Sequence, residues 1–174
     1  MRRLGFGVAA LFAAACQMDE TEKANKNVEA SMALLEESKT LEAEARKQRE
    51  EANKATTPEA LKDSATKCVT SFDAAIEKYN AASKLTKEAS ALKVSTAFSE
   101  YLDVKSQQFE KYAAATNVSA RACRSMAATG TTEEARSGDE ADQKEWAAIA
   151  EEVKALSERA ARIEREHAEQ FKKK

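Results

Sequence analysis

The sequence contains very few residues that interrupt a helix. Among its 174 residues there are four glycines and one proline, and aromatic residues make up only 6%. Two of the glycines lie within the first seven residues, the other two lie in the segment 129–139, and Pro58 stands alone. Sheet proteins depend on Gly- and Pro-rich turns and on strands rich in aromatic and β-branched residues. The composition therefore argues against a sheet and favours long α-helices.

An excess of charge of one sign and the common catalytic motifs are also absent. The chain has 28 basic and 30 acidic residues, a net charge of −2, so it has no overall positive field to attract nucleic acid. Opposite charges recur at four-residue spacing, as in Glu42 and Arg46, which is typical of a solvated helix surface. A P-loop, a serine-hydrolase elbow, Cys-x-x-Cys and His-Glu-x-x-His are all missing. We therefore expect no enzymatic activity and no cofactor.

The one long apolar run lies at the N-terminus. Arg2 and Arg3 precede an apolar segment from Leu4 to Ala15. Its length of about twelve residues is too short to span a bilayer, for which a helix needs roughly 20. Residues 13–15 are alanines, in agreement with the small-residue rule for signal-peptide cleavage. The sequence predicts that residues 1–15 are an export signal.

Cys16 follows the predicted cleavage site directly. Residues 14–16 are two small residues and a cysteine, and with them the sequence resembles bacterial membrane lipoproteins, whose lipobox ends in this way. Ala13 stands where that family usually has leucine. The resemblance implies that the thiol of Cys16 carries a diacylglyceryl group, often with a third acyl chain such as palmitate, and that residues 16–19 form the lipidated terminus and tether. Cleavage without lipid attachment is the alternative.

The resemblance covers only the first sixteen residues, and it implies a location rather than a molecular function. Two or more acyl chains are enough for stable membrane anchoring. Gln17, in place of an aspartate after the cysteine, favours the outer membrane by analogy with enterobacterial sorting. We expect a lipid-anchored protein of the bacterial cell envelope that faces the periplasm.

Four helices of similar length are predicted in a bundle domain at residues 20–174. The first runs from about Glu20 to Ala55. Thr57 and Pro58 are typical of an N-cap followed by a first helical residue, so a second helix begins there. The clearest loop is 129–139, where Ser137 or Asp139 can cap the last helix. The last helix has apolar residues at steps of three and four, beginning with Trp146, Ile149, Val153, Leu156, Ala160 and Ile163.

Cys68 and Cys123 indicate where the second helix ends. No glycine or proline divides residues 58–128, so periodicity alone permits one continuous helix. In an oxidising compartment paired cysteines usually form disulfides. In one helix these two would lie about 82 Å apart, whereas a disulfide requires Cα atoms within about 7 Å. We therefore predict a Cys68–Cys123 disulfide and a hairpin turn near residue 95, within Lys93–Thr96.

The predicted fold class is all-α, an up-down-up-down antiparallel four-helix bundle. The hairpin register places Tyr79 opposite Tyr112 and Ala82 opposite Phe109. The stripe on the first helix is thin and partly polar. The alternative is therefore a three-helix coiled-coil body with the first helix as a stalk. The stripe consists of Ala24, Asn27, Ser31, Leu34, Ser38, Leu41, Ala45, Gln48 and Ala52.

His167 is the only histidine. Glu164 and His167 match the Glu-x-x-His pattern of di-iron bundles, but such sites need two of these motifs. Haem held by this histidine and by Met18 or Met32 is a further alternative. We expect His167 to be a partly buried structural residue at the end of a core stripe, and we expect no metal site.

The leading functional hypothesis is a non-enzymatic envelope scaffold or accessory protein that binds a protein partner. Candidate contacts are the polar stripe of the first helix and Trp146, if that side chain is exposed. A periplasmic ligand-binding or sensing bundle and a haem or metal carrier are the alternatives.

Overall fold

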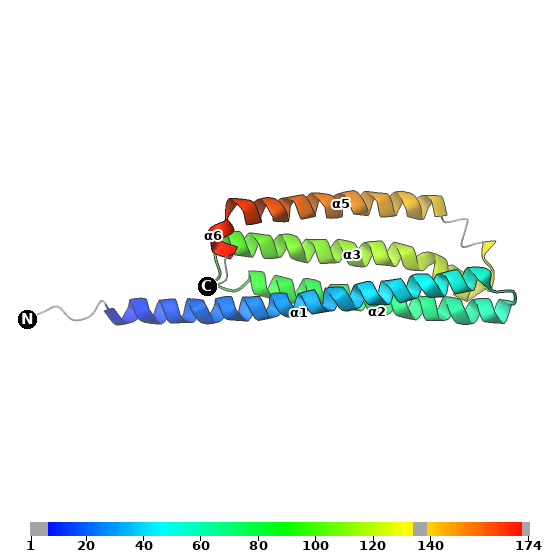
Figure 1. The fold of residues 1–174 in the computed structure, drawn as a ribbon, viewed down its shortest axis with the longest axis horizontal. Helices are drawn as coiled ribbons and strands as arrows, with labels where there is room; N and C mark the ends of the chain where they lie inside the picture. The colour runs from blue at the N-terminus through cyan, green and yellow to red at the C-terminus, as the bar shows by residue number, and fades with distance from the viewer. Residues whose placement is uncertain (1–6, 134–138, 172–174) are drawn as a thin grey trace, which may run out of the picture.

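The computed structural model describes residues 7–133 and 139–171, with those before Glu20 and Asp139 as backbone only. The described residues form helices joined by short connections, and the predicted all-α helical bundle is confirmed (Figure 1). The predicted boundary between signal and mature chain falls inside the first helix, and the backbone is helical on both sides of it. The helices are α1 (Gly7–Lys54), α2 (Pro58–Ser90), α3 (Thr96–Thr129), α5 (Asp139–Glu166) and the short α6 (Ala168–Phe171).

The helix ends follow from local capping. The Thr57 hydroxyl accepts a hydrogen bond from the Ala60 N–H, and Pro58 is the first residue of α2, as predicted. The turn predicted near residue 95 separates α2 from α3, and Ser95 caps α3 by accepting from the Phe98 N–H. Gly130 ends α3 in the left-handed conformation (φ 71°), in which its N–H donates to the Met126 carbonyl oxygen.

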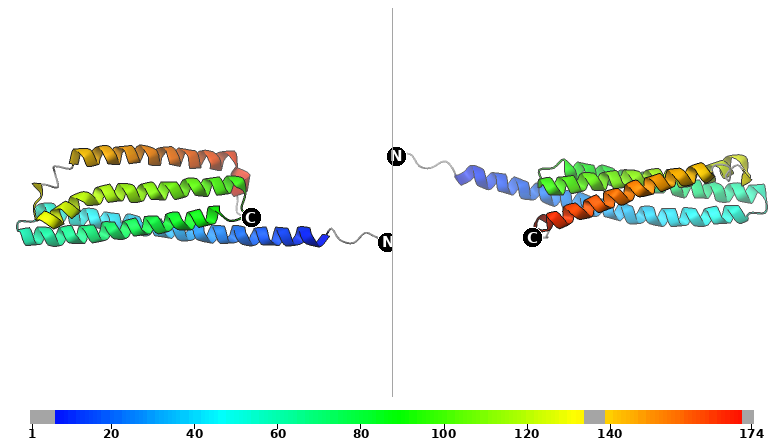
Figure 2. Two further views of the ribbon diagram at one scale, coloured as in Figure 1. Left: turned by 180° about the vertical axis from the view of Figure 1, so that it is seen from behind. Right: turned by 90° about the horizontal axis from the view of Figure 1, so that it is seen from above.

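The long helices pack in chain order. α1 lies along α2, α2 along α3, and α3 along α5, each antiparallel to the one before (Figure 1). Residues of α1, α2 and α3 share one core. By contrast, no described Cα atom of α5 lies within 8 Å of one in α1 or α2. α5 crosses the other helices obliquely when the molecule is viewed from above (Figure 2). The bundle is therefore a three-helix core with α5 added on the outer side of α3.

Small residues form the contact between α1 and α2. Five residues of α1, spaced by seven, are at most 2% exposed: Ala24, Ser31, Ser38, Ala45 and Ala52. On α2 a buried series has the same spacing: Leu61, Cys68, Ala75, Ala82 and Ala89. Ala24 packs in one cluster with Ala89, and Ala45 and Ala52 pack in another with Leu61 and Cys68. Small side chains at a contact allow the two helix axes to approach closely.

This contact corrects two expectations about the first helix. Its polar stripe was a candidate partner surface, but Ser31 and Ser38 are buried against α2. The alternative fold with the first helix as a stalk is also wrong, because α1 packs along α2 from Ala24 to Ala52. The thin stripe reflects close helix packing rather than exposure. Only the N-terminal end of α1 extends beyond the other helices (Figure 1).

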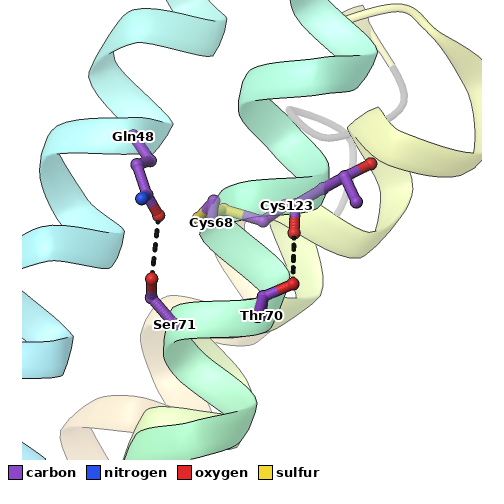
Figure 3. Close-up of a disulfide and its surroundings, with 6 residues drawn as sticks. Gln48, Cys68, Thr70, Ser71 and Cys123 are labelled. Carbon is purple, nitrogen blue, oxygen red and sulfur yellow. Dashed lines mark hydrogen bonds between the residues drawn. A yellow bond between two sulfur atoms is a disulfide. The ribbon is translucent and has the colours of Figure 1, made fainter.

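The predicted disulfide joins α2 to α3 within the shared core. Cys68 and Cys123 are bonded with their Cα atoms 6.1 Å apart, and both are fully buried. Next to the disulfide, the Ser71 hydroxyl donates to the Gln48 side-chain oxygen at 3.0 Å and connects α2 to α1 (Figure 3). The predicted register holds as well, since the rings of Tyr79 and Tyr112 are 5.5 Å apart. Ala82 and Phe109 belong to one buried cluster.

Candidate functional site

The contact between α3 and α5 differs from the core, because it is apolar at one end and charged at the other. The apolar end lies near the C-terminus of α5, where Ala160 and Ile163 pack against Ala97 and Val104. In the middle, the buried Gln108 side chain donates to the Ser157 hydroxyl at 2.7 Å. α5 therefore buries a short apolar surface against a single neighbouring helix.

Ion pairs also hold α5 to α3, and they occur along the whole contact. Arg121 contacts Asp142 at 2.9 Å and Glu145 at 2.6 Å. These contacts raise the pKa of the Arg121 guanidinium and lower the pKa of the Glu145 carboxyl, in each case chiefly through the hydrogen bonds between the two side chains. Further pairs join Arg159 to Glu100 at 2.8 Å and Lys111 to Glu152. Apart from Asp142, which is 24% exposed, these side chains are substantially exposed, so salt screens their attraction.

Trp146 lies on α5 beside the Arg121 ion pairs. The side chain is 47% exposed, and only Trp146 and Met32 are exposed large hydrophobic residues in the described part of the chain. Trp146 is therefore exposed, which is the condition under which it was a candidate partner contact. The residue begins the apolar stripe of α5, but the next member, Ile149, is the first one that is buried. An exposed indole next to charged groups is typical of a protein-binding surface, where one large side chain contributes much of the energy.

Cys16 lies in the first part of α1, near the end that extends beyond the bundle (Figure 1). Its backbone is helical, and its side chain lies outside the described residues. Glu20, one turn further along α1, is the first residue whose side chain is described, and its carboxylate accepts a hydrogen bond from the Lys93 N–H. The predicted lipid attachment point therefore lies about 6 Å before the packed part of α1.

Glu42 is a residue whose position the sequence analysis missed. It forms the expected pair with Arg46, at 3.3 Å, but its side chain is only 19% exposed. The Thr116 hydroxyl of α3 donates to its carboxylate, and the Tyr79 phenol of α2 also forms a hydrogen bond with it. Burial, followed by the negative charge of Glu42, raises the pKa of Tyr79. The sequence did contain a signal for this burial. Glu42 is four residues after the stripe residue Ser38, and this spacing places the two side chains on the same side of the helix.

The expectation for His167 was wrong. Its side chain is exposed, as are those of residues 164–166 before it, and the residue lies where the helix is interrupted between α5 and α6. Met32, one of the two methionines weighed as haem ligands, is 43% exposed on α1. Met18 lies where side chains are not described. Among the described residues there is no group of three or more His, Cys, Asp or Glu side chains that could hold a metal ion.

A surface depression is lined by Arg165–Gln170, six consecutive residues at the junction of α5 and α6. The depression results from the break in the helix between α5 and α6. It is not a space between neighbouring helices. In the described part of the chain, every buried side-chain nitrogen or oxygen has a hydrogen-bond partner. The core therefore offers no unpartnered polar group there that would point to a bound small molecule.

Comparison with known proteins provides no relative. No protein-family model matches the chain, and no curated protein or solved structure matches it. Within the residues that the structure describes, no helix is both long enough and apolar enough to span a membrane.

Proposed function

We propose that this protein is a non-enzymatic lipoprotein of the bacterial cell envelope, anchored through Cys16 to the outer membrane and facing the periplasm. Three observations support the location: the basic and apolar segment 1–15, the small residues before Cys16, and the Cys68–Cys123 disulfide. A disulfide of this kind is typical of proteins in an oxidising compartment.

Within the envelope, the protein acts as a scaffold or accessory subunit that binds a protein partner. The observation that carries this proposal is the exposure of Trp146, beside a cluster of charged side chains on the outermost helix. α5 contacts only α3 among the other long helices, so much of its surface is available to a partner. The indole contributes apolar contact area, and the neighbouring charges contribute orientation.

Site-specific photocrosslinking tests the partner-binding proposal. A photoreactive phenylalanine at position 146 of the full chain, expressed in bacteria, should form a crosslink to one envelope protein that mass spectrometry identifies. The matched control places the same residue at position 151, which is exposed on α5 about 140° around the helix. Equal crosslinking at both positions, or none at 146, would remove Trp146 as the contact.

The anchor is tested separately. The mass of the N-terminal peptide from membrane-purified protein should correspond to cleavage before Cys16 plus a diacylglyceryl group. Cys16→Ser should move the protein from the membrane fraction to the soluble fraction, because the site of lipid attachment is lost. An unmodified Cys16 in the membrane-purified protein would refute the anchor, whatever the crosslinking shows.

A further inference from the structure

One end of the bundle brings together the N-terminal part of α1, the turn between α2 and α3, and α6 (Figure 1). The hydrogen bond from the Lys93 N–H to the Glu20 carboxylate shows that residue 20 of α1 is level with the tip of this turn. Phe171 of α6 packs beside the start of α3, with ring centroids 5.8 Å from Phe98 and 5.2 Å from Tyr101. We call this end, consisting of residues 91–95 with Phe98, Tyr101 and Phe171, the anchor-side end.

The distance from Cys16 to this end is short. Cys16 precedes Glu20 by four residues in the same helix, which corresponds to about 6 Å. A lipid on Cys16 would therefore hold the tip of the α2–α3 turn next to the headgroups. Residues 16–19, the predicted lipidated terminus and tether, belong to helix α1 and are too few to let the bundle move far from the membrane.

The side chains at the anchor-side end suit a lipid surface. Exposed turns are usually built from polar residues, but here Leu92 and Val94 are only half-buried and flank an exposed Lys93. Phe98 and Phe171 behind them are also partly exposed. Aromatic and aliphatic side chains next to a lysine are favoured where headgroups meet acyl chains, since the rings enter the apolar boundary and the ammonium group contacts anionic headgroups.

We propose that the anchor-side end is a second membrane contact, which rests on the anionic headgroup layer beside the lipid of Cys16. This inference depends on the lipid anchor of the proposed function and adds an orientation to it. With one end against the bilayer, the bundle stands upright. The far end of α1, at Lys54, then lies about 50 Å from the membrane. Trp146 lies within α5, about 30 Å from the C-terminal end of that helix, which is the end nearer the membrane. The partner would bind at that height.

Tryptophan fluorescence in vesicles tests the orientation. Trp146→Phe removes the only native tryptophan. Into that background we place either Ala91→Trp, at the anchor-side end, or Thr56→Trp, in the turn at the opposite end; both native residues are exposed. Lipid-modified full-length protein is reconstituted into phosphatidylethanolamine vesicles that contain brominated phosphatidylglycerol. Circular dichroism confirms that the two variants fold alike.

The indole at position 91 should be quenched several-fold more strongly than that at position 56, because only the former is within reach of the brominated lipid. Lys93→Glu in the Ala91→Trp protein should reduce this quenching, and an unchanged value would overturn the role given to Lys93. Equal quenching at positions 91 and 56 in protein with a confirmed lipid mass would overturn the orientation alone. A Cys16 without lipid would overturn both the anchor and the orientation, so the two failures are distinguishable.

Discussion

Ser31 and Ser38 illustrate how polar residues occupy the buried contact between α1 and α2. Each hydroxyl donates to a carbonyl oxygen of its own helix, Ser31 to Val28 at 2.8 Å and Ser38 to Leu34 at 2.7 Å. The hydroxyl is thereby satisfied without a partner on α2, and the residue is as small as the contact requires. Serine and alanine are therefore nearly equivalent here, whereas a larger side chain would force the helices apart.

Ser38→Leu should lower the free energy of unfolding by about 1–3 kcal/mol, the usual cost of inserting a large side chain into a well-packed interface. Ser38→Ala should change it by less than about 1 kcal/mol, since only a local hydrogen bond is lost. Lys39→Leu, at the exposed neighbouring position, is the control for added hydrophobicity. Urea unfolding followed by circular dichroism measures all three. Wild-type stability in Ser38→Leu would contradict the close packing of α1 on α2.

Tyr101 provides a test of pH dependence at the contact between α3 and α5. Burial, followed by a hydrogen bond with Glu164, raises its pKa above the ordinary value. Because the folded-state pKa is the higher one, its contribution to stability is complete below pH about 10 and is lost as the pH rises further. Wild-type protein should therefore lose more stability above pH 10 than Tyr101→Phe does.

The comparison with Tyr101→Phe isolates the contribution of the Tyr101 hydroxyl group to the pH dependence of stability. Lys105, whose pKa burial lowers, is present in both proteins and responds to pH in the opposite sense. Unfolding experiments over this pH range measure the difference between the two proteins. If the free energy of unfolding falls with pH equally in the wild type and in Tyr101→Phe, the pKa of the Tyr101 phenol is not raised in the folded protein.

At the scale of the elements, α5 is attached differently from the other long helices. α1, α2 and α3 share a buried core, but α5 has a short apolar contact and several exposed ion pairs. A helix held in this way depends more on electrostatic attraction, which falls with ionic strength. This arrangement keeps α5 ordered beside α3 while most of its surface stays available.

Raising the salt concentration should therefore loosen α5 before it affects the core. Trp146 is the only tryptophan, so quenching of its fluorescence by acrylamide reports on this helix directly. Quenching should rise with salt in the wild type. Arg121→Gln should be more strongly quenched already at low salt, because its pairs with Asp142 and Glu145 are lost.

Lys144→Gln is the matched control for that experiment, since the ion pair of Lys144 with Glu140 lies within α5. It should leave both the low-salt quenching and its salt dependence close to the wild-type values. Salt-independent quenching in the wild type would mean that apolar contacts, rather than charges, determine how α5 is held.

At the scale of the whole molecule, the disulfide links α2 to α3 far along both helices from the short turn that joins them. The bond closes a loop with a sequence separation of 55 residues. In the chain-entropy model such a link stabilises the folded state by roughly 4 kcal/mol, because it restricts the unfolded chain. It also joins α2 to α3, the pair to which the other helices attach.

Reduction should accordingly lower the urea midpoint strongly, with a loss of roughly 4 kcal/mol in the free energy of unfolding. The two thiols stay in place, so the comparison does not introduce a cavity. Mass spectrometry after alkylation should find free Cys68 and Cys123 thiols only in the reduced sample. An unchanged midpoint in fully reduced protein would show that the packed helices need no covalent link.

Much of the helix pattern could be predicted because its causes are local. Thr57 and Pro58 start α2 through their own side chains, and the segment 129–139 contains the glycine that ends α3. The turn near residue 95 has no glycine or proline, but the cysteine pair required it, since a covalent bond demands that distant residues meet. The turn and the opposition of Tyr79 and Tyr112 followed from that single constraint.

The sequence by itself determined the helices, their order and the cysteine pair, because capping, periodicity and covalent geometry act within a helix or between two known residues. Only the tertiary structure decided which surfaces are covered. It buried the thin stripe of α1, enclosed Glu42 between three helices and left Trp146 and His167 exposed. Burial depends on the shape of the neighbouring helix and on how many neighbours a helix has, and α5 has only one long neighbour.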